Sequence, residues 1–282
     1  MLTIIIISYN SAGIINQCQK ELLLSDRFQI VCVDNASPDG SGNKLRDQFP
    51  DVDVISLDKN IGYGRAANVG LRKADTPYAL LLNPDLVTSP EDIQQLLEYA
   101  ENDTSNTAIW GPASLKKDFT GEPPQSVKWV SGCAMLFDVE KIRKVGLFDE
   151  NIFLFSEETD LCERTIAAGY EIKLCKDIYF DHLVGQASTP NPHVEYMKWW
   201  HFGWSQCYRM TKNGHCTWIR NPRRKLLTYR MHSFTSSSPE KRMKWKAKAD
   251  GASAFIRGDK AFDEQGRPKM SDFSKQPQPR RA

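Results

Sequence analysis

The 282-residue sequence predicts an α/β fold in which helices flank a mostly parallel central sheet, followed by a helical, basic C-terminal extension. The first observation is that apolar strand-like segments alternate with helical segments over residues 1–182, which is typical of a parallel sheet. The second is charge: residues 209–282 contain 19 Lys/Arg and 6 Asp/Glu, whereas residues 1–208 contain 18 and 29. With 40% hydrophobic and 26% charged residues, the composition is that of an ordinary globular protein.

The first four strands share one local pattern. The segment TIIII at residues 3–7 is apolar and β-branched, as expected for a strand buried on both faces. Similar strands are expected to begin at Phe28, Val52 and Tyr78, with helices over 14–24 and 61–74. The segment PDGSG at residues 38–42 is expected to be a loop because it combines proline, aspartate and glycine.

The remaining elements follow from helical spacing and end signals. A helix is expected after Pro90, with Ser89 as its N-cap. Residues 112–124 are predicted to be rich in loops. The later elements are a strand and a short helix within 127–146, a helix ending near Ala168, a strand ending at His182 and a helix over 193–212. The last residues, 274–282, are expected to be disordered.

Polar residues follow four of the predicted strands where each strand ends. These residues are Ser8 and Asn10, Asp34 and Asn35, Asn60, and Asn83 and Asp85. In open α/β sheets, ligands bind beyond the carboxyl ends of the strands. A single aspartate after a strand is usually a turn or helix cap. Four such ends in one sheet favour a shared binding site.

Two residues at strand ends are candidate metal ligands. Asp85 follows LLLNP, and a carboxylate there can bind Mg²⁺ or Mn²⁺ that bridges to substrate phosphates. The alternative is that Asp85 caps the following helix. His182 ends the last predicted strand, and imidazole suits Mn²⁺ better than Mg²⁺, although a lone histidine is more often structural.

An acidic cluster and a glycine-rich segment are the other candidates for function. Glu157, Glu158 and Asp160 crowd a helix start after the apolar IFLF, and repulsion among them favours a raised pKa suited to a general base. Ordinary acid enrichment at a helix start is the alternative. The glycines of NIGYGRAANVG do not fit the dinucleotide fingerprint, but Arg65 could neutralise a diphosphate.

Taken together, these segments resemble a known family. The motifs IIIISYNS, VDNASPDGS, NIGYGRAANVGLRKA, LLLNPD, SGCAMLF and GLFDENIFLFSEETDLCERTIAAGYEI occur in the order and spacing of family-2 glycosyltransferases with the GT-A fold. The chain is most similar to bacterial rhamnosyltransferase-like enzymes, and the resemblance covers about residues 1–185. It implies an inverting enzyme that uses a nucleotide-diphosphate sugar and Mn²⁺ or Mg²⁺.

The resemblance also implies roles for individual residues. Asp85 would be the remaining carboxylate of the metal motif, whose first aspartate is replaced by Asn83, and His182 would be a second metal ligand. Glu158 would be the catalytic base, with Glu157 as the alternative. The donor would be held by the following residues: Ser8, Tyr9, Asn10, Asp34, Asn60, Arg65, Asn83 and Asp85.

The substrates follow only from the branch of the family that the chain resembles. That branch implies dTDP-rhamnose as donor and a glycan or polyprenyl-diphosphate-linked glycan as acceptor, in bacterial surface polysaccharide synthesis. A UDP-hexose or UDP-N-acetylhexosamine transferase of the same family is the alternative. A non-catalytic nucleotide-sugar-binding scaffold is the alternative from a different class.

Residues 1–189 are predicted to form the catalytic domain and residues 190–282 an aromatic and basic helical extension. Trp199 and Trp200 could stack on acceptor sugars or lie at a lipid interface, and the alternative is that they close a core or a homodimer interface. The basic segments of the extension favour an anionic membrane surface, and no nucleic-acid recognition motif accompanies them. Seven cysteines without a C-x-x-C pair, and no membrane-spanning segment, predict a cytoplasmic protein, peripheral on the inner membrane face.

Overall fold

The computed structural model describes residues 1–183, 191–212 and 221–270, and the structural statements below refer to these. The chain forms two compact units. Unit 1 consists of residues 1–150 and 157–189, and unit 2 consists of residues 151–156 and 190–282. The short segment 151–156, which the sequence placed with the first domain, therefore groups with the C-terminal helices. The segment predicted to be disordered, 274–282, lies outside the described residues.

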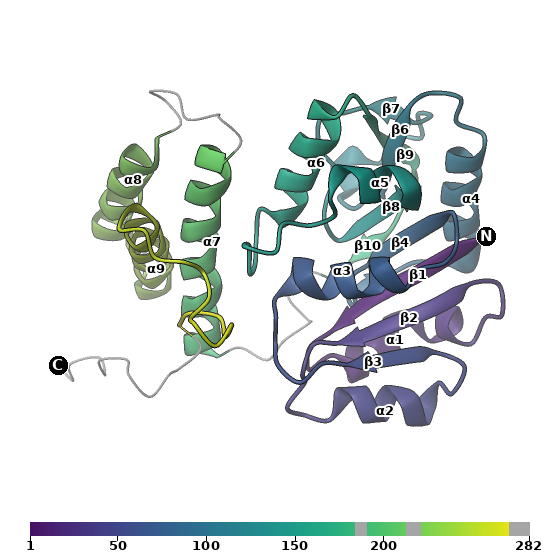
Figure 1. Ribbon diagram of the computed structural model, residues 1–282, viewed down its shortest axis with the longest axis horizontal. Coiled ribbons are helices and arrows are strands. Elements are labelled where there is room, and N and C mark those ends of the chain that lie inside the picture. Colours follow the sequence, from purple (N-terminus) through teal and green to yellow (C-terminus); the bar gives the residue numbers. More distant parts are fainter. Residues whose placement is uncertain (184–190, 213–220, 271–282) are drawn as a thin grey trace. The chain divides into compact units, whose positions relative to one another are not determined.

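Unit 1 is built on an eight-stranded sheet with the order β3-β2-β1-β4-β8-β6-β9-β7 (Figure 1). The strands are β1 Leu2–Ser8, β2 Gln29–Asp34, β3 Asp53–Ser56, β4 Tyr78–Leu82, β6 Thr107–Ala113, β7 Gln125–Ser126, β8 Ala134–Asp138 and β9 Glu171–Tyr179. The first four strands run parallel, and β8 lies antiparallel between β4 and β6. Because these four strands are parallel, the carboxyl ends of β1, β2, β3 and β4 lie at the same edge of the sheet.

Helices cover both faces of this sheet. On one face lie α1 Ala12–Leu23, α2 Ser41–Gln48 and α4 Pro90–Glu101; on the other lie α3 Tyr63–Lys73, α5 Val139–Val145 and α6 Glu157–Ala167. Strand β1 explains the two layers, because Ile4 and Ile6 face the first set of helices whereas Ile5 and Ile7 face the second. The predicted α/β fold class is confirmed.

Local signals set several element boundaries. Helix α4 begins with a capping box in which the Ser89 side chain accepts from the Asp92 N–H, as expected from the sequence. Helix α5 begins at the N-cap Asp138 and ends at Gly146, whose φ of 103° lies in the left-handed region. These caps fix where the loop before α4 ends and where the loop after α5 begins.

Two elements differ from the prediction. Strand β6 was not expected, because Gly111 and Pro112 interrupt its apolar run; Gly111 is needed there, since a Cβ would lie 2.7 Å from Val130. Helix α2 begins inside the segment predicted to be a loop. It has one buried apolar side chain, Leu45, so its sequence carries little helical periodicity.

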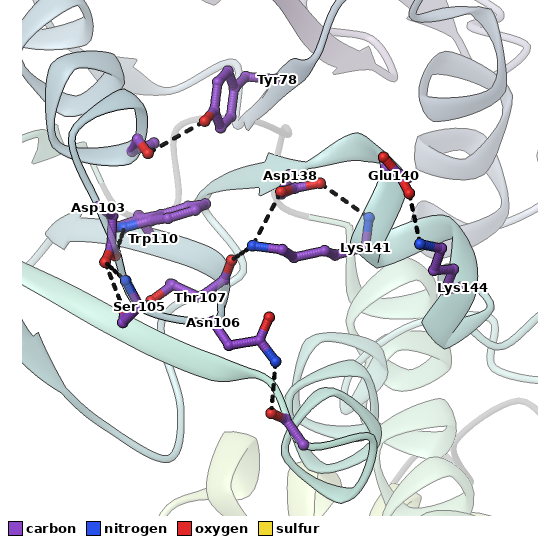
Figure 2. Close-up of polar contacts among 12 residues, drawn as sticks. Tyr78, Asp103, Ser105, Asn106, Thr107, Trp110, Asp138, Glu140, Lys141 and Lys144 are labelled. Carbon is purple, nitrogen blue, oxygen red and sulfur yellow. Dashed lines mark hydrogen bonds and ion pairs between the residues drawn. The ribbon is translucent and has the colours of Figure 1, made fainter.

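A polar network ties the edge of the sheet where β4 begins and β8 ends (Figure 2). Asp103 accepts hydrogen bonds from Ser105 Oγ at 2.6 Å and Trp110 Nε1 at 3.0 Å, and Lys173 Nζ lies 2.8 Å away. Burial works against ionisation of Asp103, but the bonds from Lys173 and Ser105 outweigh it and hold its pKa well below the usual range. Lys141 donates to the Thr107 carbonyl at 2.8 Å. This edge is therefore polar and fully bonded.

Unit 2 consists of α7 Pro192–Lys212, α8 Pro222–Thr235 and α9 Pro239–Ile256, together with residues 151–156. Helices α7 and α9 meet at two glycines. A Cβ on Gly203 would lie 2.1 Å from the Lys248 carbonyl oxygen, and one on Gly251 would lie 1.9 Å from that of Trp200. The two backbones therefore touch, which only glycine permits at these positions.

The tryptophans of α7 mainly build the core of unit 2. Trp200 is 5% exposed and packs with Trp204, Phe153 and Phe262. The Trp204 Nε1 donates to the Asp259 carbonyl oxygen at 2.7 Å, which satisfies its buried N–H. For Trp200 and Trp204 the structure agrees with the alternative of a core, because neither ring faces solvent. No helix in the described ranges is long and apolar enough to cross a bilayer.

Candidate active site

The ends of β1 and β2 form the first part of the site. These strands are parallel, with Ser8 paired to Asp34, so the side chains that follow them lie close together. Ser8 Oγ lies 3.0 Å from Ser11 Oγ, and the Asn10 N–H donates to Ser37 Oγ at 2.9 Å. Ser37 also donates to the Asp34 carboxylate. Ser8, Asn10 and Asp34, predicted to hold a nucleoside, are thus brought together.

The neighbouring backbone is shaped around Asp34. A Cβ on Gly42 would lie 2.6 Å from Asp34 Oδ2, so the start of α2 approaches the carboxylate closely. Asn10 and Ala36 have φ values of 55° and 61°, in the left-handed region that non-glycine residues seldom adopt. The Tyr9 side chain is exposed beside this turn.

Asn35 and Asn60 fix the entry to α3. The Asn35 Nδ2 donates to Asn60 Oδ1 at 3.1 Å, and Asn35 Oδ1 accepts from the Ile61 N–H at 2.9 Å. Asn60 Oδ1 also accepts from the Gly62 N–H at 3.0 Å. In this structure Asn60 positions a loop. The contact of Asn60 with the nucleotide-sugar donor stays a prediction.

Asn83 holds the Asn-Pro-Asp turn after β4 in place through its hydrogen bonds. Its N–H donates to the Cys133 carbonyl oxygen at 2.8 Å, and its own carbonyl accepts from Gln19 Nε2 at 2.7 Å. Its side-chain oxygen accepts from Tyr63 Oη at 2.8 Å. Because its groups are used to hold the turn, Asn83 fixes the position of Asp85, which is buried.

A two-stranded sheet brings His182 to Asp85. Strands β5 Leu86–Val87 and β10 Asp181–His182 pair antiparallel, and the Leu183 N–H donates to the Asp85 carbonyl oxygen at 3.0 Å. His182 Nε2 then lies 3.2 Å from Asp85 Oδ1. The neighbouring side chains of Asp85 and Cys133 raise the pKa of His182 to about 10, against the opposing effect of burial. Two residues 97 positions apart in the chain are thus in contact.

These two side chains fit a divalent cation. A carboxylate oxygen and an imidazole nitrogen suit Mn²⁺, and Mg²⁺ accepts carboxylate oxygen as well. No cluster of three His, Cys, Asp or Glu ligands is found in the part of the chain that the structure describes. Two protein ligands would leave the other positions to substrate phosphates and water, as is usual where such ions bind nucleotides.

The three acids of the α6 start differ in environment. Asp160 is buried and pairs with Arg164 at 2.7 Å, so it is structural. Glu157 is buried, and its Oε2 has no hydrogen-bond partner within the described residues. Burial, and then the charge of Glu158, raise the pKa of Glu157 to about 8. Glu158 is half-buried and packs on Gly132, where a Cβ would lie 3.0 Å from Glu158 Cβ.

Tyr63 is a site residue that the sequence analysis did not single out. Its hydroxyl contacts Asn83 Oδ1 at 2.8 Å and the Gly132 carbonyl oxygen at 3.0 Å. Burial and the nearby Glu157, Cys133, Glu158 and Asp85 raise its pKa well above the usual range, so the hydroxyl keeps its proton. The Tyr63 hydroxyl is therefore affected both by Asp85, the candidate metal ligand, and by the acids at the start of α6. Its place in the glycine-rich entry IGYG was the only available signal.

Arg65 lies in the first turn of α3. Its Nε donates to the Glu150 carbonyl oxygen at 2.5 Å, and burial lowers its pKa despite Glu150 and Asp149 nearby. Its predicted contact with a diphosphate stays a prediction.

Trp199 and Trp200, predicted to bind acceptor, belong to unit 2. Trp199 stacks on Phe155 with ring centroids 5.8 Å apart, whereas Trp200 lies in the core and presents no ring face to solvent. We therefore do not carry Trp200 into an acceptor site.

The chain has recognisable relatives. A dTDP-rhamnosyl transferase, RfbF, from Shigella flexneri is 26% identical over 57% of this chain and 61% of its own length. A low-salt glycan biosynthesis hexosyltransferase, Agl10, from Haloferax volcanii is 25% identical over 62% of this chain and 64% of its own length. The chain thus spans less than two thirds of the length of these relatives.

The chain is also similar to solved structures and matches a family model. The mannosyltransferase PcManGT from Pyrobaculum calidifontis, in complex with GDP-Man and Mn²⁺, matches with a TM-score of 0.59 at 14% identity, covering 91% of this chain and 86% of its own. S. aureus TarS residues 1–349 in complex with UDP match with a TM-score of 0.54 at 15% identity and 91% coverage of both chains. These likenesses support the fold. The model described as "Glycosyl transferase family 2" matches residues 3–160, more than half of the sequence, and the chain therefore belongs to that family, as predicted.

Proposed function

We propose that the chain transfers a sugar from a nucleotide-diphosphate donor to a glycan acceptor, with inversion at the anomeric carbon. The observation that carries this proposal is the convergence of Asp85, His182 and the α6 acids at the carboxyl edge of the sheet, in a family-2 chain. An acceptor oxygen would attack the anomeric carbon as the bond from that carbon to the diphosphate oxygen breaks. The diphosphate would leave with the bonding electrons.

Asp85 and His182 would hold the cation. A bound Mn²⁺ or Mg²⁺ would offset the negative charge of the leaving diphosphate. The chain's own part is to present the two ligands together: Asn83 and Pro84 fix the turn, and the β5–β10 pairing carries His182 to it. Ser8, Asn10 and Asp34 would hold the nucleoside, with the exposed Tyr9 beside them.

Glu158 is the proposed general base. A base must be ionised before it accepts a proton, and the raised pKa of Glu157 keeps that carboxyl protonated near neutral pH. Glu158 lies beside Gly132, where the missing side chain leaves it room against the loop before β8. It would take the proton of the acceptor hydroxyl as that oxygen attacks. Glu157 is the alternative base.

The finer proposal is a rhamnosyl donor on dTDP. It is supported by relatives named as a dTDP-rhamnosyl transferase and as an N-acetylglucosaminyl-diphospho-decaprenol L-rhamnosyltransferase of Mycobacterium tuberculosis. The second name also supports a polyprenyl-diphosphate-linked acceptor. A UDP-linked hexose or N-acetylhexosamine remains the alternative donor.

Calorimetric titration with dTDP, UDP and GDP, each with Mn²⁺ and with chelator, tests this proposal. We expect dTDP to bind tightly only with metal, and Asp85→Asn to abolish the metal dependence. Preference for UDP would move the donor to the alternative class. Nucleotide binding without sugar transfer from any donor would favour the non-catalytic scaffold, and failure of the folded protein to bind any of the three would overturn the proposal.

Attachment to the inner face of an anionic membrane is a further part of the proposed function, and α8 supports it. Leu227, Met231 and Phe234 are 64%, 56% and 86% exposed, and their spacing places them on one face of the helix. Arg223, Arg224 and Arg230 are also exposed on α8. An apolar stripe beside arginines is typical of helices that lie in a lipid interface.

Co-sedimentation with vesicles tests the role of α8. We expect binding to phosphatidylglycerol vesicles, weaker binding to phosphatidylcholine, and loss of binding in Leu227→Glu/Phe234→Glu. The neighbouring exposed Thr228→Glu is the matched control and should bind much more strongly than the double variant. Equal binding by all three proteins would place the contact elsewhere, and salt-dependent binding to duplex DNA in place of vesicles would contradict a membrane partner.

A further inference from the structure

A buried lysine lies at the centre of the helices of unit 2. Lys248 belongs to α9, the helix labelled in Figure 1, and only 6% of its surface is exposed to solvent. Its Nζ lies 3.9 Å from the ring centroid of Phe202, 4.6 Å from Trp245, 4.7 Å from Trp199 and 5.8 Å from Tyr229. Aromatic side chains from all three helices thus surround one ammonium group.

Two more lysines adjoin this group. Lys244 Nζ lies 3.8 Å from the Trp199 centroid, and Lys225 Nζ lies 5.7 Å from that of Tyr229. Burial, and then the charges of Lys244 and Lys225, lower the pKa of Lys248 to about 8. We call Lys225, Lys244 and Lys248 the lysine cluster.

The described part of unit 2 offers this cluster no counter-charge. Helix α8 contains no acidic residue. On α7, Glu195 pairs with Lys198 at 3.0 Å, and on α9, Asp250 pairs with Lys246 at 2.8 Å and accepts from Tyr196. The other α9 acid, Glu240, is exposed in the first turn of that helix. None of the three lysines has an ion pair within the described residues.

The aromatic rings do not complete the environment of Lys248. Ring faces attract a cation, but they accept hydrogen bonds poorly, and an ammonium group has three N–H donors. Burial of Lys248 disfavours its charged form, and the like charges of Lys244 and Lys225 add to that cost. A ligand with several anionic oxygens would accept from these donors and offset all three charges at once.

We propose that the lysine cluster binds a phosphate or diphosphate group. The rings of Trp199, Phe202 and Trp245 would wall the site, and the ammonium groups would contact the phosphate oxygens. Apart from Trp199, a candidate for acceptor binding, the site uses no residue assigned to the active site, so it does not depend on the residues proposed for donor binding and transfer. The group could come from a soluble phosphate compound or from the head group of a lipid diphosphate.

The first test is calorimetric titration of the full chain with inorganic pyrophosphate in excess chelator, which removes metal-dependent binding at the active site. We expect saturable binding that Lys248→Met weakens at least tenfold, with a smaller loss in Lys244→Met. Lys241→Met, an exposed lysine on the same helix, is the matched control and should bind as the wild type does. Lys248→Arg, which keeps the charge, should retain most of the affinity.

A second titration distinguishes the source of the group. Phosphatidylcholine vesicles containing a polyprenyl diphosphate replace pyrophosphate, with plain phosphatidylcholine vesicles as the blank. Binding of pyrophosphate that depends on Lys248 assigns a site for soluble phosphates, and Lys248-dependent binding of the doped vesicles alone assigns a lipid head group. If neither probe binds, or if Lys248→Met and Lys241→Met behave alike, the proposal is overturned. Should Lys248→Met fail to fold, the half-buried Lys244→Met carries the same comparison.

Discussion

The two edges of the central sheet hold buried carboxylates in opposite states. Where β4 begins, Asp103 accepts from Ser105 and Trp110 (Figure 2). Lys173 also donates to it, and its pKa is held low. Where β4 ends, Glu157 is more deeply buried, one of its oxygens has no partner in the described chain, and its pKa is raised. The charge of a buried acid therefore depends on the donors around it as well as on its burial.

This difference separates stability from function. A satisfied buried network stabilises the fold, whereas an unsatisfied acid reduces stability and persists where chemistry needs it. Perturbed groups gathered in one place are typical of functional sites. Variants at the two edges should therefore affect different measurements.

The largest effect is expected at the active edge. Glu158→Gln should lower the rate of sugar transfer about 10³-fold, because it removes the proposed proton acceptor, as general-base substitutions commonly do. The free energy of unfolding should change by less than about 0.5 kcal/mol, as for other partly exposed polar substitutions. Steady-state transfer assays and urea denaturation check both statements. Glu140→Gln, an exposed residue of α5, is the control, and a Glu158→Gln enzyme as fast as this control would move the base to another residue.

The opposite edge should show the reverse. Asp103→Asn should lower the free energy of unfolding by about 3 kcal/mol, because it leaves Lys173 half-buried without its counter-charge. The matched control is Glu122→Gln, which removes the more exposed partner of Lys176 on the same strand, and a loss of about 0.5 kcal/mol or less is expected there. Urea denaturation of both variants gives the comparison. Equal losses would show that the Asp103 network is no stronger than a surface ion pair.

A smaller effect is expected in the pH dependence of stability. The folded-state pKa of Glu157 is raised, so its contribution is fully present below pH 4.5 and is lost as the pH rises towards about 8. The Gln side chain of Glu157→Gln cannot ionise. Between pH 5 and 8 the free energy of unfolding of this variant should therefore fall by about 1–3 kcal/mol less than that of the wild type. Unfolding free energies across that range measure this difference. Parallel curves for the two proteins would mean that Glu157 is ionised in the folded state.

The sign is opposite for Asp103, whose folded-state pKa is depressed. Its stabilisation is present above pH 4 and is lost as the pH falls below that value. Asp103→Asn should therefore flatten the acid limb of the stability curve and leave the limb above neutral pH unchanged.

Short-range patterns predicted the parts of the molecule that depend on neighbouring residues. The capped start of α4 at Ser89 follows from a local hydrogen bond, and the polar strand ends follow from the alternation of strands and helices. The family followed from the order of the motifs.

Long-range contacts account for what the sequence did not predict. Strand β6 is held by pairing with β8 and β9, which overrides its glycine and proline. The role of Tyr63 depends on Asn83 and Gly132, which lie 20 and 69 residues away. Among the crowded acids, Glu157 has a raised pKa, and burial outweighs repulsion as the cause. These features depend on contacts between distant parts of the chain.

The segment 151–156 has a consequence for any attempt to shorten the chain. Phe153 lies within the core of unit 2, 4.5 Å from the His201 ring and 5.8 Å from that of Phe262, and the Leu154 carbonyl oxygen accepts from Ser205 Oγ at 3.1 Å. The next residues, Phe155 and Ser156, both have positive φ and lead directly to Glu157. A protein cut after residue 189 would keep Phe153 and lose the core residues His201 and Phe262 that pack against it. Unit 2 therefore cannot be removed without consequence, because its core holds the segment 151–156, which immediately precedes the acids of α6.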